Sequence, residues 1–281
     1  MLFRSGTSDQ QHTLLPKVAA GELLLTLAVD ETPRHNPAQV STRLENKGDG
    51  FVLNGRKQFV IDGHVADKLI VSARSSGADN ERDGISLLLV DRTAAGVNVE
   101  RVSMADSRNA ALVTFADVAV PASDLLGEAG QGFDALELTL DVVNGQLAAE
   151  LLGLSLESFE RTVAYLQERK QFGVTLSSFQ GLQHRCAHLF SELELVKSVV
   201  LKALMALDEG DEDASLLVSL AKAKACEVAE LATNEAVQMH GGMGMTDEFD
   251  IGLFMKRARC VQTLFGDARY HANRFALLKG Y

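Results

Sequence analysis

Apolar and polar residues follow two different periods along the chain. From Phe133 onward, apolar residues recur at steps of three and four among good helix formers, which predicts helices. Between residues 22 and about 120, short apolar runs alternate with turn residues, which favours an antiparallel β-barrel or sandwich. The predicted strands are Leu23–Val29, Thr42–Glu45, Gly50–Asn54, Lys68–Ala73, Ile85–Val90, Val97–Val102 and Ala110–Phe115.

The helical part is interrupted by turn-forming stretches. They lie at Gln171–Val174, in the acidic run 208–213 and in the glycine stretch 241–244. Four long helices with short connections predict an antiparallel four-helix bundle, so the predicted fold class is α+β.

A short helical segment precedes the strands. Its helix, Thr7–Ala20, is predicted to have Thr7 or Ser8 as N-cap and to stop at Gly21. The predicted domains are therefore residues 1–21, residues 22–127 with the β domain, and residues 128–281 with the bundle.

The composition excludes some classes of binding partner and suggests a cellular compartment. The 38 acidic and 27 basic residues give a net charge of −11, which argues against nucleic acid or an anionic membrane as the main partner. Cys186, Cys226 and Cys260 have no spacing typical of a metal site or a disulfide framework, which suggests a reducing compartment. With no signal peptide and no membrane-length apolar run, we expect a cytoplasmic protein without a metal.

Two segments of the helical part are candidates for ligand binding. The first, Gln238-Met239-His240-Gly241-Gly242-Met243-Gly244, ends a helix with glycines that accept positive φ and let backbone N–H groups approach a ligand. The second is Arg169-Lys170-Gln171-Phe172-Gly173, followed by Ser178-Phe179-Gln180. Taken alone, each is explained by an ordinary helix C-terminus with a capping glycine.

Taken together, these segments resemble the C-terminal helical domain of the acyl-CoA dehydrogenases, a family whose β domain precedes a bundle. The resemblance implies an FAD that residues of a neighbouring subunit help to hold. An Arg fork suits the FAD pyrophosphate better than Lys. The FAD-binding residues implied here are Arg169, Gln171, Phe172, Gln180, Gln238, Gly241 and Gly242.

The β domain carries weaker matches to the same family. Asn54-Gly55-Arg56-Lys57-Gln58-Phe59-Val60-Ile61 resembles a segment that flanks the flavin, with Phe59 in place of Trp and Ile61 in place of Thr. Asp30-Glu31-Thr32-Pro33 resembles a second such segment with Asp30 in place of Thr, so Val29 and Asp30 are also implied in flavin binding. Asp30 would disfavour an anionic reduced flavin unless it points away or is protonated. Core packing explains Phe59 equally well.

The family's reaction needs a carboxylate with a raised pKa as base. The family's Glu position falls on Phe265, which cannot accept a proton, so Asp267 is the candidate base. The alternative explanation is an N-cap for the helix Ala268–Leu278. A second base position used in the family falls near Asn144, with Asp141 one turn away, and both are predicted to bind substrate.

Other polar residues nearby are expected to be structural. We expect Asp267, His271 and Arg274 to form a surface network, and His240 to be structural, since a single His beside glycines is weak evidence for a ligand site.

The pattern Phe-Gly-Asp-x-x-x-His resembles the small subunit of heteromeric, pimeloyl-CoA dehydrogenase-type enzymes, here without most of the N-terminal helical domain. The implied activity is FAD-dependent oxidation of an acyl-CoA to the trans-2-enoyl-CoA, as in fatty acid β-oxidation, with electron-transfer flavoprotein or a similar acceptor. The implied assembly is a homo- or hetero-oligomer, a dimer or tetramer. A non-catalytic partner subunit that completes another chain's flavin site is the alternative, and a flavin oxidase or hydroxylase is a third.

Overall fold

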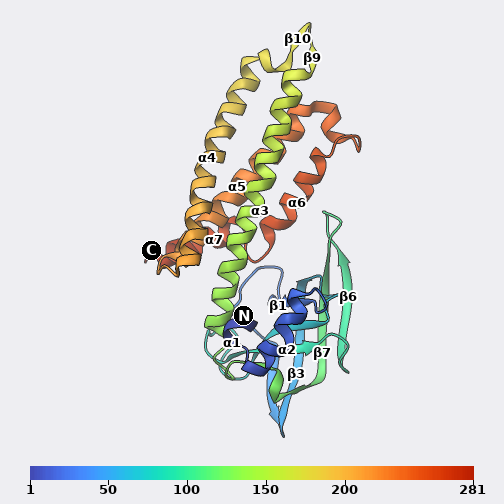
Figure 1. The fold of residues 1–281 in the computed structure, drawn as a ribbon, viewed down its shortest axis with the longest axis vertical. Helices are drawn as coiled ribbons and strands as arrows, with labels where there is room; N and C mark the ends of the chain where they lie inside the picture. Colours follow the sequence, from blue (N-terminus) through green and yellow to red (C-terminus); the bar gives the residue numbers. More distant parts are fainter. The chain divides into compact units, whose positions relative to one another are not determined.

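The structure, a computed structural model, describes the backbone of residues 1–281 and the side chains of all of them except residues 2 and 3. Contacts within the chain divide it into two units, Met1–Thr139 and Leu140–Tyr281. Figure 1 traces both units. The domain bounds predicted from the sequence remain a prediction. None of the helices in the described part of the chain is long and apolar enough to cross a membrane.

The first unit begins with helices α1 (Leu2–Ser5) and α2 (Ser8–Ala19). Thr7 is the N-cap of α2, as predicted: its hydroxyl accepts the Gln10 N–H, and the Gln10 side chain accepts the Thr7 N–H at 2.8 Å. The Gln10 amide also donates to the carbonyls of Ser123 and Leu125, at 2.6 and 3.1 Å. The buried Gln10 thus completes the cap of α2 and also hydrogen-bonds α2 to the segment Ser123–Leu125.

Eight strands of the described chain build the sheet of this unit. They are β1 (Leu25–Ala28), β2 (Arg43–Lys47), β3 (Gly50–Ile61), β4 (Lys68–Arg74), β5 (Ile85–Asp91), β6 (Val97–Ser103), β7 (Asn109–Pro121) and β8 (Leu125–Leu126). The pairing runs β6-β7-β3-β2-β4-β5-β8, with β1 beside β4, and a short 3-10 turn, η1 (Ala122–Asp124), precedes β8. The core between them is rich in Leu, Val and Ala.

The prediction of a purely antiparallel sheet is wrong, and of the two predicted architectures the barrel is not formed. Both β1 and β2 run parallel to β4, so the sheet is mixed, and the pairings among the described strands form an open path instead of a closed barrel. The physical reason is that alternation of apolar and polar residues decides which face of a strand is buried, whereas it does not decide the direction of the neighbouring strand.

Five helices make up most of the second unit as described, where four were predicted. They are α3 (Phe133–Glu168), whose first turns belong to the first unit, α4 (Gln180–Glu209), α5 (Ala214–His240), α6 (Ile251–Thr263) and α7 (Ala268–Leu278). The last two are separated because Gly266 has φ +107° and Asp267 caps α7. A hairpin of β9 (Lys170–Gln171) and β10 (Val174–Thr175) joins α3 to α4 through η2 (Leu176–Ser178), and η3 (Gly241–Met245) follows α5.

Helix α5 is central to this unit. It packs against α4, α6 and α7, and its buried residues lie on several sides, from Leu216 to His240. Ion pairs between Arg161 and Asp250 and between Glu150 and Arg257 show that α6 runs antiparallel to α3. The core they enclose is mainly Ala, Val and Leu, which lets the helices approach closely.

Candidate functional site

The two helical motifs meet at one end of the second unit. The Tyr165 ring, one turn before Arg169, stacks on the His240 ring at 4.3 Å between centroids, and the Tyr165 hydroxyl lies 3.4 Å from the His240 carbonyl oxygen. At the start of α4, the Cys186 Sγ lies 3.8 Å from the Met239 Sδ. The end of α3, the start of α4 and the end of α5 are therefore neighbours, and the β9–β10 hairpin projects from this end (Figure 1).

His240 is structural in this arrangement. It is buried, and its Nδ1 donates to the Ala236 carbonyl at 2.7 Å, because a carbonyl oxygen can only accept. Burial lowers the pKa of His240, so the neutral ring is favoured at neutral pH. Phe249 packs edge-on against both rings, with centroids 5.8 Å from His240 and 5.9 Å from Tyr165. The cluster holds the residue directly before the glycine pair.

The hairpin carries exposed polar groups and an exposed aromatic ring. Arg169, Gln171 and Gln180 are all exposed, and the Arg169 guanidinium has no ion-pair or hydrogen-bond partner among the described residues. Phe172 is 90% exposed and has a φ of +56°, which is rare outside glycine, and its ring meets that of Phe179 edge-on at 6.2 Å. A free guanidinium three residues before a solvent-facing ring suits an anionic ligand with an aromatic part.

The glycine pair leaves its surface open. Gly241 has φ +60° and ψ −137°, a conformation that is open essentially to glycine alone. No atom lies within 4 Å of the position where a Cβ would be added at Gly241 or at Gly242. Gln238, one turn earlier, is also exposed. Gly244 differs, because a Cβ there would lie 2.7 Å from the Val237 carbonyl oxygen, so it serves close packing.

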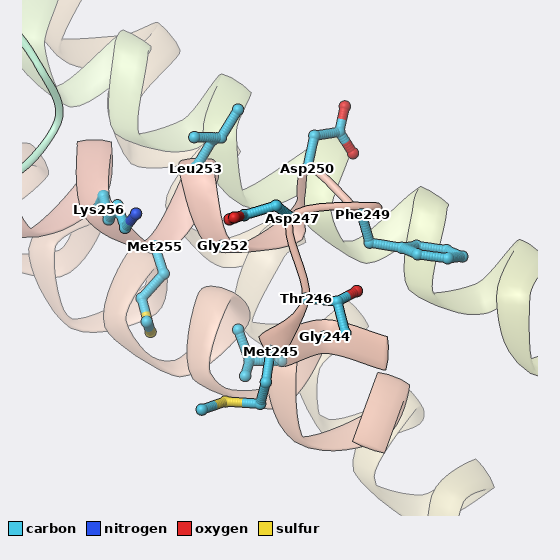
Figure 2. A pocket seen from close by; sticks show the side chains of 11 residues that line it. Gly244, Met245, Thr246, Asp247, Phe249, Asp250, Gly252, Leu253, Met255 and Lys256 are labelled. Carbon is cyan, nitrogen blue, oxygen red and sulfur yellow. The ribbon is translucent and has the colours of Figure 1, made fainter. Parts of the chain in front are cut away.

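A cleft of about 250 Å³ continues from the glycine turn. It lies between the segment that follows the glycines and the first turns of α6, with Phe249 and Lys256 on opposite sides of the view (Figure 2). Its lining residues are Val237, Gly244, Met245, Thr246, Asp247, Phe249, Asp250, Gly252, Leu253, Met255 and Lys256. No group of three His, Cys, Asp or Glu side chains placed to hold a metal ion occurs among the described residues.

The candidate substrate residues lie far from this end. Asp141 is buried on α3 and pairs with Arg274 of α7 through contacts of 2.6 and 3.1 Å. The Ser215 hydroxyl donates to the same carboxylate at 2.6 Å. Asn144 is also buried, and its Oδ1 has no partner among the described groups. The structure thus ties Asp141 into an interhelical ion pair, and the assignment of both residues to substrate binding stays a prediction.

The expected surface network of Asp267, His271 and Arg274 is wrong. His271 is fully buried, with its Nε2 3.2 Å from the Phe265 carbonyl oxygen, and Arg274 pairs with Asp141. The cause is that the face of α7 that carries His271 and Arg274 packs against neighbouring helices. A spacing of one helical turn predicts that two residues share a face, but it does not predict whether that face meets solvent or other helices.

Asp267 is exposed at the N-terminus of α7. Its Oδ1 accepts the Tyr270 N–H at 2.8 Å, which makes it the N-cap, while its second oxygen has no partner among the described residues. Phe265, two residues earlier, has φ +50°, and Gly266 cannot be replaced without strain, because a Cβ would lie 2.4 Å from a ring carbon of Tyr270. The cap leaves one carboxylate oxygen available.

Within one chain, the candidate substrate residue Asp141 and the candidate cofactor residues of this unit do not meet. Asp141, at the α7 end, and Glu168, beside Arg169, lie on the same helix α3. At a rise of 1.5 Å per residue, the 27 steps along the helix from Asp141 to Glu168 span about 40 Å. Asp141 and Arg169 therefore do not line a common pocket within this unit.

The first unit brings its four predicted residues together. The Gln58 N–H donates to the Asp30 carbonyl at 2.7 Å, and the Thr26 hydroxyl donates to the Ile61 carbonyl at 2.6 Å, so the segment of Val29 and Asp30 lies along β3. A register shift between Lys57 and Val60 accompanies the positive φ of Phe59, whose side chain is 49% exposed. The exposed ring is available to a ligand rather than to the core.

The Asp30 carboxylate has an ion-pair partner. It pairs with Nδ1 of His35 at 2.8 Å, and the His35 side chain is only 4% exposed. Asp30 therefore has a local partner inside its own segment, which sequence reasoning did not anticipate.

A fully buried lysine supports this segment and was also missed. The Lys57 Nζ donates to Glu31 at 2.7 Å and to the Val29 carbonyl and the Ser72 hydroxyl at 3.0 Å. Burial lowers the pKa of Lys57, which the Glu31 charge partly opposes. The signal available in the sequence was Lys57 itself, four residues after the core position Leu53 and therefore on the same face of a strand.

Comparisons with known proteins identify the family. Residues 130–276 match the family described as "Acyl-CoA dehydrogenase, C-terminal domain", and residues 28–118 match "Acyl-CoA dehydrogenase, middle domain". The chain is 30% identical over 280 residues to the short/branched chain specific acyl-CoA dehydrogenase of Bos taurus, covering 98% of this chain and 64% of that protein. It is 31% identical to a "Probable acyl-CoA dehydrogenase" of Bacillus subtilis, over 93% of this chain and 70% of that one.

A solved structure agrees. The butyryl-CoA dehydrogenase of Megasphaera elsdenii superposes with a TM-score of 0.92 at 28% identity, over 99% of this chain and 74% of that one. The mixed sheet and helical unit are thus those of acyl-CoA dehydrogenases, and the chain belongs to the acyl-CoA dehydrogenase family. It spans 64% of the length of the bovine relative.

Proposed function

We propose that this chain is an FAD-dependent acyl-CoA dehydrogenase that converts an acyl-CoA thioester to the trans-2-enoyl-CoA. The observation that carries the proposal is the meeting of an exposed, unpartnered Arg169 and the open Gly241–Gly242 turn at one end of the helical unit. Family membership supports it, and the bovine and Megasphaera relatives are named for acyl-CoA substrates.

The residues at this end fit an FAD. A pyrophosphate needs a fixed cationic donor, and Arg169 offers a guanidinium that no described carboxylate occupies. Gln171, Gln180 and Gln238 present exposed amides, and the glycine pair leaves its backbone open to close approach. In the first unit, the exposed Phe59 ring of β3 can pack against a flat ring system, with Ile61 on the same strand and the Val29–Asp30 segment beside it.

When bound, FAD supplies the acceptor for the hydride that leaves Cβ of the acyl chain. The chain's own task is to remove the Cα proton. Asp267 is the candidate base because one of its carboxylate oxygens is free while the other caps α7. The buried Asp141 and Asn144 would border the acyl-CoA from α3, with Asn144 offering an unpartnered amide oxygen.

The distance along α3 supports a site shared between chains. Because about 40 Å of α3 separates the candidate substrate residue Asp141 from Glu168 beside Arg169, Arg169 and the glycine turn of one chain would hold the FAD that works beside Asp141 and Asp267 of another. The proposed assembly is a dimer or tetramer, homomeric or paired with a large acyl-CoA dehydrogenase subunit as in pimeloyl-CoA dehydrogenase-type enzymes. Electron-transfer flavoprotein or a similar protein would reoxidise the flavin, in the cytoplasm.

A second function is favoured by Phe265. This residue stands where the family's pattern places the catalytic Glu, and Asp267 is exposed and engaged as a cap. A chain of this kind could complete another subunit's flavin site without catalysing the reaction itself. An active chain whose activity depends on Asp267 argues against this alternative, and oxygen consumption with peroxide release would indicate an oxidase instead.

Flavin retention tests the proposal. The variants Arg169→Ala and Lys170→Ala each remove one exposed cation from adjacent positions where α3 passes into the hairpin, and only Arg169 is assigned to FAD. Purified side by side, Arg169→Ala should lose most of its bound FAD, whereas Lys170→Ala should keep it. Equal flavin content in both variants would contradict the assignment.

A further inference from the structure

Lys222 of α5 has no role in the site described so far, yet it is completely buried. A lysine ammonium in the interior costs free energy unless hydrogen bonds satisfy it. In this structure its Nζ donates to the carbonyls of Val261, Leu264 and Gly266 at 3.1, 3.0 and 3.3 Å. All of these oxygens belong to the end of α6 and the turn toward α7.

The three oxygens flank a stretch in which two consecutive residues have positive φ. Phe265 lies between two of the Lys222 acceptors and has φ +50°, and Gly266 has φ +107°. Non-glycine residues with positive φ persist only where the surroundings hold them. The carbonyls at the end of a helix also lack intrahelical partners, so one ammonium can satisfy several at once.

We propose that Lys222 is a positioning residue that holds the turn from Leu264 to Asp267 and thereby directs the Asp267 carboxylate. The inference rests on the proposed function for the catalytic part, whereas its structural part stands on the hydrogen bonds alone. Lys222 contacts main-chain oxygens on the buried side of the turn, whereas the Asp267 side chain is exposed to solvent. Burial lowers the pKa of Lys222, and nearby Cys226, Asp267 and Glu150 oppose this effect.

The test compares Lys222→Met with Lys224→Met in the full-length chain. Lys224 lies two residues further along the same helix, is partly exposed and pairs with Glu192, so its replacement removes a lysine without touching the turn. Hydrogen exchange followed by mass spectrometry would report on the peptide covering residues 260–271. Lys222→Met should raise exchange in this peptide about tenfold or more, and Lys224→Met should leave it unchanged. Unchanged exchange in Lys222→Met would overturn the proposal.

Kinetics provide a second readout that a general loss of stability would not reproduce. A displaced base lowers kcat by about 10- to 100-fold while the acyl-CoA site itself is kept, so KM should change far less than kcat, at unchanged flavin content. Equal kcat in Lys222→Met and the wild-type chain would overturn the catalytic part. If the wild-type chain has no acyl-CoA activity, the proposed function fails, and the exchange result still decides the role of Lys222.

If Lys222→Met does not fold, native-state hydrogen exchange of the wild-type chain tests whether Lys222 holds the turn. The turn held by Lys222 should open only together with α5, so that amides of both exchange with the same denaturant dependence. Exchange of the turn at much lower denaturant than α5 would overturn the proposal.

Discussion

Asp141 and Arg274 form a two-point ion pair between α3 and α7, with N···O distances of 2.6 and 3.1 Å, and the Asp141 side chain is only 4% exposed. Removal of one partner from a buried pair leaves an uncompensated charge. Asp141→Ala should therefore lower the free energy of unfolding by about 3 kcal/mol. Urea unfolding measures this, with Glu160→Ala as the control on the exposed side of α3, where a change within about 0.5 kcal/mol is expected. Equal effects of the two variants would contradict the pair's structural role.

The Glu31–Lys57 pair predicts an acid-sensitive first unit. Burial alone raises the pKa of Glu31, but the Lys57 charge and hydrogen bonds from Lys57, Thr42 and Ser41 outweigh it. The pKa of Glu31 in the folded state is therefore below its ordinary 4.5. The stability that this shift contributes is present above pH 4.5 and disappears as the pH falls through the folded pKa.

Glu31→Gln cannot be deprotonated, so it tests this dependence. The variant should be less stable than the wild type at neutral pH, and the difference should shrink as the pH falls from about 5 to about 3. Chemical unfolding at several pH values gives the two curves. Parallel curves over this range would show that Glu31 does not contribute to the acid sensitivity.

The glycine pair permits a matched comparison. A Cβ at Gly241 or at Gly242 would meet no atom within 4 Å, but only Gly241 has a positive φ. Gly241→Ala should therefore lower stability by about 1–3 kcal/mol through backbone strain, while Gly242→Ala should leave it nearly unchanged. Both variants should weaken FAD binding, since the added methyl group occupies the open surface. Full flavin content in Gly242→Ala would show that this surface does not face the cofactor.

Asp267 can be tested as a cap and as a base separately. Asn is as good an N-cap as Asp, so Asp267→Asn should keep stability, whereas Asp267→Ala should lose about 1 kcal/mol. If Asp267 is the base, both variants should lose acyl-CoA oxidation, because neither carries a carboxylate. Thermal unfolding and steady-state kinetics on the same preparations separate the two roles. An active Asp267→Asn chain would leave Asp267 as a cap alone.

Much of the fold could be predicted because local signals agreed with the final structure. The Thr7 cap, the glycine end of α5 and the cap at Asp267 each depend on residues within a few positions of one another. Strand direction does not have this property, and for this reason the parallel pairing of β1 with β4 was missed.

The residues that support the site were harder to predict. Lys57 and Lys222 are charged, so a pattern of polar and apolar residues assigns them to the surface, although both are fully buried. Each is explained only by partners that are distant in sequence, Glu31 for the first and the Val261–Gly266 carbonyls for the second. The meeting of Tyr165 with His240 is equally non-local, and it is this contact that joins the two cofactor motifs.

The most direct test of the account is an anaerobic titration of the purified chain with saturated acyl-CoA thioesters of increasing chain length, followed by its visible absorption spectrum. The account predicts a flavin band that co-elutes with an oligomer on a sizing column and bleaches on addition of at least one acyl-CoA. A flavin band that no acyl-CoA bleaches, or an oligomer that binds no flavin, would contradict it.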